Sequence, residues 1–449
     1  MKCSLYWSRW PLLVTIAFLP SLITPAIGQG EKDKPVVAAS EPASRSDFEH
    51  RMLSARDACD WKLLLRIGRE WQQSHPADAN GPFAEAIGAY FLGDMPTAMA
   101  AWQKSKRLNS DFSPNADKWL RNAYYVHKNF PTLQLQQLTL DGADAWEESQ
   151  VWWDKARTLL AKHQYEEIEK VAVTLQKSNA ANIKGTPFLE TFFSGLASGG
   201  SGKGTPQQRI AAWRHAKPNS TLARLAEIQI WTDAAWKARG KDVASSITPA
   251  MQKRIDQCVG RASQLIRSLP APAKQSPLTF VSLMKWGQFT GDRAFLDQTF
   301  ADAVRKHPNY NGLYTMRAYL LLPRWYGNPG EWEELVAGRA NRLGGERGDI
   351  FYARIFADGI AVSGDIFPET GASYARVQRG LFGLQKRRPA SVSVFTAQLR
   401  AASSAKEWKL AQAMLLSPKG NHLDVTAGPL TPFMWHTWRL QVLAQQVTQ

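Results

Sequence analysis

Two pairs of adjacent glutamates, Glu166-Glu167 and Glu333-Glu334, are the residues of this chain whose type best suits general acid–base chemistry. Neighbouring side chains on a helix point about 100° apart, so neither pair can place two carboxylates around one bond. The closest approach to a zinc-binding helix begins at His163 and lacks the second histidine, and no Cys-x-x-Cys or Gly-x-Ser-x-Gly motif occurs. The sequence therefore predicts no catalytic residue, metal ligand or cofactor, although carboxylates from distant helices could still converge.

Residues 195–205 (GLASGGSGKGT) resemble a phosphate-binding loop in composition. In such a loop the lysine is followed by a magnesium-binding Ser or Thr, and the loop follows a strand. Here Gly204 follows Lys203, and the preceding residues have a helical pattern. We therefore predict a mobile loop at 195–205 without phosphate chemistry.

The N-terminal residues have the pattern of an export signal. Lys2 and Arg9 precede or open an apolar stretch, and Ala26-Ile27-Gly28 supplies small residues for cleavage. We expect residues 1–28 to be a signal peptide cleaved near Gly28, residues 29–47 to be a flexible leader, and the mature protein to be periplasmic or secreted. The apolar stretch is short and interrupted by prolines, and no later segment is long and apolar enough to span a membrane.

Cleavage would leave two cysteines, Cys59 and Cys258. In an exported protein they could form one disulfide bond. Both lie in amphipathic helical patterns, however, where a buried free cysteine acts as a small apolar side chain. The sequence leaves both interpretations open.

The chain is basic, with a formal net charge of +16 that falls to +14 when Lys2 and Arg9 are removed. Such a charge suits contact with anionic lipid, polysaccharide or nucleic acid. The basic residues are dispersed, and the one dense cluster, Lys386-Arg387-Arg388, precedes Pro389, where it suits a helix C-terminus. We therefore expect no nucleic-acid partner; the expected partner is a protein, a peptide or an anionic envelope polymer.

The elements that must position all these side chains are helices. From residue 48 onward apolar residues recur with a period of 3.6, and two Gly-Asp turns, Gly93-Asp94 and Gly291-Asp292, separate pairs of such segments. In both copies apolar or small residues follow the glycine by five, nine and twelve positions. This pattern is typical of tetratricopeptide-type hairpins, which stack because none can bury its apolar face alone. We predict an all-α, tetratricopeptide-like array (an α-solenoid or a compact arch), with N-terminal repeats at 48–130 and a larger repeat domain at 150–449.

The chain has eighteen tryptophans, and most stand at core-facing helical spacings. A large ring fills the wedge between stacked hairpins and buries much apolar area. We expect six in the core: Trp102, Trp213, Trp231, Trp236, Trp286 and Trp332. Trp435 and Trp438 have the weakest core pattern, because a terminal hairpin leaves one face open.

Two motifs carry a family resemblance. The first runs from Tyr319 to Trp325 (YLLLPRW) and follows the segment KHPNY at 306–310; the second is WKARG at 236–240. Together they resemble a bacterial, often exported family that has a domain of unknown function and tetratricopeptide-like helices. The resemblance covers residues 150–415 and implies a fold and a compartment, but no catalytic residues. The chain departs from the family pattern at Tyr326, where the family has glycine.

Five residues are candidates for ligand contact. Arg324 is the residue of its motif that the fold needs least, which suits an ion pair or a ligand, and Trp325 would fold back over the preceding apolar turn. The first helix of each hairpin lines the concave face of a repeat array. This geometry points Lys285, Gln288 and Tyr90 toward the groove.

The sequence supports two classes of function. The first is a non-enzymatic, exported helical-repeat protein that mediates protein or polymer interactions in the cell envelope, with a structural spacer on the membrane surface as a weaker variant. The second is an envelope hydrolase whose acids converge in a cleft of the solenoid. Paired carboxylates in a pocket would favour the hydrolase, and a groove without them would favour the binding protein.

Overall fold

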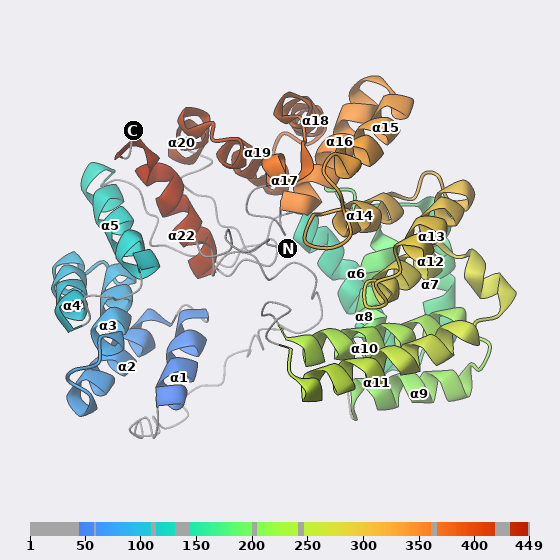
Figure 1. The fold of residues 1–449 in the computed structure, drawn as a ribbon, viewed down its shortest axis with the longest axis horizontal. Helices are drawn as coiled ribbons and strands as arrows, with labels where there is room; N and C mark the ends of the chain where they lie inside the picture. The colour runs from blue at the N-terminus through green and yellow to red at the C-terminus, as the bar shows by residue number, and fades with distance from the viewer. Residues whose placement is uncertain are drawn as a thin grey trace, which may run out of the picture. The chain divides into compact units, whose positions relative to one another are not determined.

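The structure is a computed structural model that describes residues 45–57, 60–108, 114–130, 144–199, 204–240, 247–360, 366–417 and 432–447. Within these ranges every regular element is a helix (Figure 1), which confirms the all-α helical-repeat prediction. Only one extended pairing interrupts them, an antiparallel bridge between Ala181 and Pro187. No helix in the described residues is both long and apolar enough to cross a membrane. The expected signal peptide, residues 1–28, lies outside these ranges.

The helices form two compact units, which we describe separately. Unit 1 comprises residues 144–405 and unit 2 comprises the helices before residue 143 and after residue 406. The helices of unit 1 are α6 (Asp144–Ala161), α7 (Tyr165–Ser178), α8 (Phe188–Ala197), α9 (Pro206–Ala216), α10 (Thr221–Arg239), α11 (Pro249–Arg267), α12 (Pro277–Gly287), α13 (Arg293–Lys306), α14 (Asn311–Leu320), α15 (Glu331–Leu343), α16 (Gly345–Ile360), α17 (Ile366–Thr370), α18 (Tyr374–Arg387) and α19 (Val392–Ser404).

Both Gly-Asp turns connect the two helices of a hairpin. Gly93 and Gly291 have φ of +82° and +69°, a left-handed conformation that glycine adopts without steric cost. The following aspartate then caps the next helix: Asp94 accepts a hydrogen bond from the Thr97 amide at 3.1 Å, and Asp292 accepts one from the Phe295 amide at 2.9 Å. In each Gly-Asp pair, therefore, the glycine forms the turn and the aspartate caps the N-terminus of the next helix.

The first helices of the hairpins in unit 1 pack side by side and form a closed succession. Helices α6, α8, α10, α12, α14, α16 and α19 contact one another in that order, and α19 contacts α6. We call these seven the inner helices; α7, α9, α11, α13, α15 and α18 pair with them as second helices. The arrangement buries two apolar clusters, one spanning α6 to α14 and one centred on α14 to α19.

The contact between α6 and α19 closes the succession. In this contact, a residue of α6 caps the N-terminus of α19, which is distant in sequence. Asp144, the first residue of α6, accepts hydrogen bonds from the Ser393 amide at 2.9 Å and the Ser391 hydroxyl at 2.7 Å, both at the start of α19. The Ala145 amide donates to Ser393 Oγ at 3.1 Å. Burial raises the pKa of Asp144, but these hydrogen bonds outweigh it, so its pKa lies below the ordinary value.

Replacing this carboxylate tests how much the closure stabilises unit 1. Asp144→Ala should lower the free energy of unfolding by about 1–3 kcal/mol, because two donors at the start of α19 lose their acceptor. Because the folded pKa is depressed, the stabilisation is present above the unfolded pKa and is lost as pH falls through the folded one. Urea unfolding followed by circular dichroism at pH 7 and pH 3 measures both effects. Asp154→Ala on the same helix, where the carboxylate accepts only from Gln150, is the matched control; equal effects of the two substitutions at pH 7 would contradict the closure.

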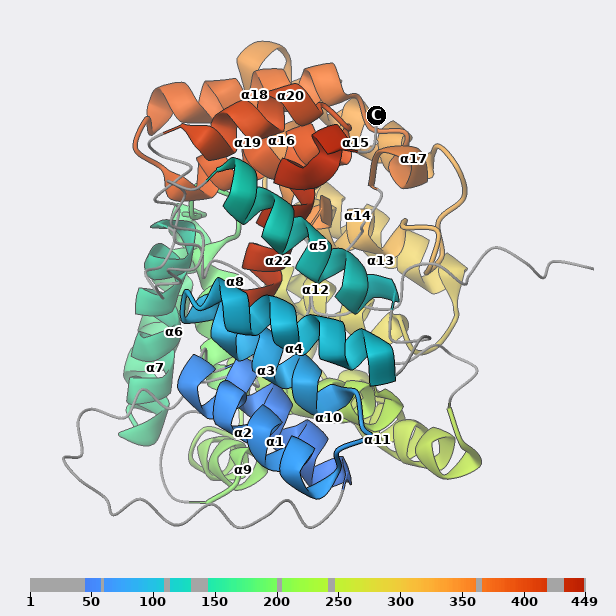
Figure 2. The same ribbon diagram turned by 90° about the vertical axis from the view of Figure 1, so that its left-hand side faces the viewer.

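Unit 2 is built from both ends of the chain. Its helices are α1 (Arg45–Asp57), α2 (Trp61–Ser74), α3 (Asn80–Phe91), α4 (Met95–Leu108), α5 (Pro114–Asn129), α20 (Trp408–Leu416) and α22 (Pro432–Leu443). Helices α1 to α4 pack in sequence order, and α22 lies beside α5 (Figures 1 and 2). Residues after 406 therefore group with the N-terminal helices, whereas the sequence analysis placed them with the 150–405 repeats.

Three details differ from the expected pattern. The apolar residues from Leu53 to Trp71 have the spacing of one helix face, which predicts a single first helix. The structure divides them between α1 and α2, because Asp60 caps α2 by accepting from the Leu63 amide at 3.0 Å. Helix α1 begins at Arg45, inside the segment expected to be a flexible leader. The first residues of the expected loop 195–205 belong to the end of α8, and residues 200–203 lie outside the described residues.

Some tryptophans are buried in the apolar core, and others lie at its edge and are partly exposed to solvent. Trp213 and Trp332 are almost completely buried, and Trp102 is 8% exposed. Trp231 and Trp286 pack against the first apolar cluster of unit 1 while keeping part of their surface in solvent. Trp438 is half-buried, and the side chain of Trp435 lies outside the described residues.

Candidate functional site

The inner helices of unit 1 carry a cluster of charged side chains. We call it the inner cluster and define it as Lys184, Glu190, Asp233, Lys285 and Asp358, contributed by the α7–α8 connection, α8, α10, α12 and α16. Its members interact electrostatically in a chain: Asp233 with Lys285, Lys285 with Glu190, Glu190 with Asp358, and Asp358 with Lys184. Residues far apart in sequence therefore come close enough to influence one another electrostatically.

Hydrogen bonds hold two of these carboxylates. Asp233 Oδ1 accepts from Gln229 Nε2 at 2.6 Å, one turn earlier on α10. Asp358 Oδ2 lies 3.5 Å from the Thr315 hydroxyl of α14.

Glu190 is held differently, by the close approach of α8 to the start of α14. A β-carbon on Gly312 would lie 1.5 Å from Glu190 Oε1, so the carboxylate in this position packs directly against the Gly312 backbone. This oxygen is buried, and the Tyr310 hydroxyl is the hydrogen-bonding group beside the Glu190 carboxylate.

The protein desolvates these groups although each keeps partial solvent contact. Desolvation is the largest influence on all three carboxylates: it raises the pKa of Asp233 to about 6, that of Asp358 to about 7, and that of Glu190 above its usual range, against the opposing effect of the two lysines. The same desolvation lowers the pKa of Lys184. A carboxyl group that titrates near neutrality is also a common property of catalytic and binding sites.

The raised pKa values predict that stability depends on pH. Between about pH 4 and pH 7 the folded protein binds more protons at Asp233 and Asp358 than the unfolded chain does, so stability should fall as pH rises through this range. Asp358→Asn should remove much of that slope and raise the free energy of unfolding at pH 8 by about 1–3 kcal/mol. Urea unfolding at pH 5, 6, 7 and 8 measures it. Asp256→Asn on α11, where the aspartate is exposed, should leave the slope unchanged; an unchanged slope in Asp358→Asn would show that burial does not shift this carboxyl group.

A second cluster lies one helical turn further along three inner helices, at their C-terminal ends. We call it the motif junction and define it as Trp236, Gln288, Tyr319, Arg324 and Trp325. Each helical member follows a residue of the inner face by three or four positions: Trp236 follows Asp233, Gln288 follows Lys285, and Tyr319 follows Thr315. The two sequence motifs, WKARG and YLLLPRW, thus meet in space.

The aromatic rings of the motif junction contact one another. The Trp236 and Trp325 rings meet edge to face with centroids 5.5 Å apart, and Tyr319 lies 5.8 Å from Trp325. Phe289 packs on the other side of Trp236 at 4.5 Å, and the Arg239 guanidinium lies 5.6 Å from the Trp236 ring centre.

The chain after α14 turns back sharply to place Arg324 and Trp325 there. The Trp325 amide donates to the Leu322 carbonyl at 2.9 Å, and the Tyr326 amide donates to the Leu320 carbonyl at 3.1 Å. Gly327 passes so close to Leu321 that a β-carbon would lie 1.7 Å from the Leu321 carbonyl oxygen. The bend therefore requires a glycine at this position.

The five candidate residues do not form a single site. Gln288, Arg324 and Trp325 lie together in the motif junction, and Lys285 lies one turn away in the inner cluster. Tyr90 belongs to unit 2, where it is 2% exposed and packs edge to face on Phe91 at 5.2 Å. Sequence analysis missed the remaining carboxylates and Lys184; a polar residue within an otherwise apolar inner helix was the available signal.

The other chemical candidates have structural partners or lie apart. Glu166 pairs with Lys217, and Glu333 accepts a hydrogen bond from the Tyr352 hydroxyl. Cys258 is a buried free cysteine, and burial raises the pKa of its thiol, whereas Cys59 lies outside the described residues. No group of three or more His, Cys, Asp or Glu in the described chain could hold a metal ion.

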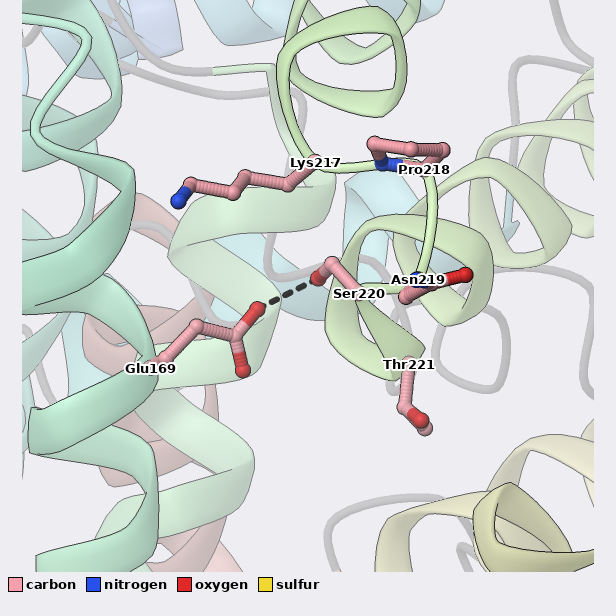
Figure 3. Close-up of a pocket in the computed structure, with 6 residues that line it drawn as sticks. All are labelled: Glu169, Lys217, Pro218, Asn219, Ser220 and Thr221. Atoms are coloured by element: carbon pink, nitrogen blue, oxygen red, sulfur yellow. Dashed lines mark hydrogen bonds between the residues drawn. The ribbon is translucent and has the colours of Figure 1, made fainter.

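A cleft of about 350 Å³ lies where the α9–α10 turn faces α7 (Figure 3). It is lined by Glu169 and by residues 217–221. The Ser220 hydroxyl donates to Glu169 and also accepts from the Ala223 amide at 3.0 Å, as the cap of α10. Desolvation raises the pKa of Glu169. Glu169 and Ser220 therefore already serve as hydrogen-bond partners within the protein.

Part of the chain is similar to a protein family of unknown function. Residues 153–317 match the family described as "Domain of unknown function (DUF4034)". This span runs from α6 into α14, and it contains WKARG but ends before YLLLPRW. No curated protein matches the chain. Among solved structures, the crystal structure of the yeast Tom70 aligns with a TM-score of 0.33 and 12% sequence identity, covering 90% of this chain and 89% of that chain.

Proposed function

We propose that this chain is an exported, non-enzymatic helical-repeat protein that binds a protein or peptide segment in the cell envelope through the inner helices of unit 1. The observation that carries this proposal is the inner cluster, in which five charged side chains from five separate elements interact electrostatically. Export rests on the sequence pattern of residues 1–28.

The inner cluster is a poor way to stabilise a fold and a good way to recognise a partner. Desolvating a charge costs free energy, and well-packed apolar residues would stabilise the same space better. Repeat arrays present such polar side chains on a concave surface for binding. The cluster contains both lysines and carboxylates, which favours a peptide with charges of both signs over a uniform polyanion, because complementary charges set specificity.

Charge reversal on the inner face tests the proposal. The double variant Asp233→Lys, Lys285→Glu keeps the net charge and should lose the envelope proteins that wild type captures after crosslinking, because each charge would face its like in the partner. Asp256→Lys, Lys253→Glu reverses two exposed charges on α11 and is the matched control. Quantitative mass spectrometry of the captured proteins gives the measurement. If the inner variant and the control capture the same set, the inner face is not the binding surface.

A hydrolase is the second candidate, and one observation favours it. The pKa values of Asp233 and Asp358 lie near neutrality, as that of a general acid must, and both carboxylates belong to the inner cluster. Release of dye from labelled envelope glycan would establish catalysis if Asp233→Asn and Asp358→Asn each abolished it while keeping the circular dichroism of wild type. No release by the wild-type protein would leave binding as the function.

A further inference from the structure

The solvent-facing side of α18 carries basic side chains on both sides of an exposed aromatic ring. Helix α18 packs on α16 and α19 (Figure 1), which leaves one of its faces to solvent. That face is formed by Ala375, Arg379, Phe382 and Lys386, which are all exposed and follow one another by three or four positions. We call these four residues the α18 stripe. Phe382 is 54% exposed, more than any other aromatic side chain that the structure describes.

Close packing on α16 sets this orientation. A β-carbon on Gly380 would lie 2.0 Å from the Asp349 carbonyl oxygen, and one on Gly383 would lie 3.1 Å from Glu346 Cγ. These two glycines therefore bring the opposite face of α18 directly against the start of α16. Phe382 stands on the other side of the helix, so its exposure follows from the packing of a well-seated helix.

The basic charge around the α18 stripe exceeds the acidic charge that faces it. Residues 374–388 contain no acidic side chain and five basic ones: Arg376, Arg379, Lys386, Arg387 and Arg388. Asp349 of α16 pairs with both Arg376 and Arg379, at 3.0 and 2.7 Å, so one carboxylate serves two guanidinium groups. Glu346 and Glu148 each pair with one arginine at the end of the helix. Lys386 makes no ion pair within the described chain, and a surplus of positive charge remains.

A helix end accounts for only part of this pattern. Basic residues at 386–388 suit the negative end of the α18 dipole. Arg379 lies about two turns before that end, however, and an exposed Phe382 gives the helix no such benefit, because an apolar ring in water costs free energy. The ring and its flanking cations together indicate a partner that is anionic and also accepts an apolar group.

We propose that the α18 stripe docks the protein on an anionic lipid membrane surface. The helix lies flat on it, the Phe382 ring enters the boundary between headgroups and acyl chains, and Arg379 and Lys386 reach lipid phosphates on either side. A lipid surface fits better than an acidic protein, because lipid headgroups rearrange around a stripe one residue wide, whereas an aromatic anchor in a protein interface fills a matching pocket. The stripe shares no residue with the inner cluster, so this surface goes beyond the proposed function.

Sedimentation with lipid vesicles tests the assignment. At low salt the full chain should bind phosphatidylcholine vesicles that contain about one third phosphatidylglycerol at least about tenfold more tightly than pure phosphatidylcholine vesicles, because each basic residue near an anionic surface adds to the attraction. Equal binding to the two kinds of vesicle would overturn the proposal. Soluble polyglutamate represents the acidic-protein alternative: if it binds the chain through Arg379 and Lys386 and the anionic vesicles do not, the lipid assignment is wrong.

Two variants separate the contribution of charge from that of the ring. The double variant Arg379→Gln, Lys386→Gln should weaken binding to the anionic vesicles at least about tenfold at low salt, and this loss should shrink at about 0.3 M salt as the charges are screened. Phe382→Ser should weaken binding about fivefold at both salt concentrations, because salt does not screen apolar burial. Unchanged binding by Phe382→Ser would overturn the insertion of the ring.

Matched variants control for net charge and for exposed apolar area. The double variant Arg305→Gln, Lys253→Gln removes the same charge from exposed positions on α13 and α11, and Val173→Ser removes an apolar side chain that is 51% exposed on α7. All variants keep residues 1–28, so that apolar stretch contributes equally to each. If the α18 variants bind the vesicles as these controls do, the protein does not dock through α18.

The α18 variants should keep the fold. Asp349 retains Arg376 as an ion-pair partner when Arg379 is replaced, and both Phe382 and Lys386 are exposed. Circular dichroism and the thermal midpoint check this. The vesicle experiment is also independent of protein capture by the inner cluster, since neither set of variants changes a residue of the other.

Discussion

A helical hairpin cannot bury its apolar face alone, and the architecture of unit 1 follows from this constraint. Each inner helix packs on the next, so the first helix of one hairpin becomes the neighbour of the first helix of another. The succession needs an end, and it ends where α19 meets α6 through Asp144 and the start of α19. Closing the array in this way leaves no inner helix of unit 1 with an unpartnered side among the described residues.

Closing the succession of inner helices costs free energy, because it partly desolvates their polar side chains. Once the inner helices face one another, any charge they carry is partly withdrawn from water, which explains why Asp233 and Asp358 hold their protons to near neutrality. The positive charges of Lys184 and Lys285 offset part of this cost. A fold selected for stability alone would place apolar residues here. The charges of the inner cluster therefore indicate a functional role, for which the fold accepts a lower stability.

The sequence was sufficient for the helices because their determinants are local. The period of 3.6, the Gly-Asp turns and the helix caps act within a few residues, and so most helix positions could be predicted. The break at Asp60 was missed because one apolar series continues across two helices with only a cap between them. The grouping of α22 with α5 could not be predicted, since a contact between segments hundreds of residues apart leaves no trace in local periodicity.

The residues of the candidate sites also differ in whether the local sequence reveals them. Arg324 and Trp325 attracted notice because a short motif contains both, whereas Glu190 and Asp358 are single polar residues in apolar helices whose neighbours are set by the fold. What sequence alone could not show is that Trp236 lies against Trp325. That contact gives both motifs a shared physical role: WKARG supplies an aromatic ring at the end of α10, and YLLLPRW bends the chain after α14 to bring the Trp325 ring against it. Packing requires the rings, but it does not require an arginine whose donors remain unpaired, and this excess over the needs of the fold distinguishes the motif junction from ordinary core.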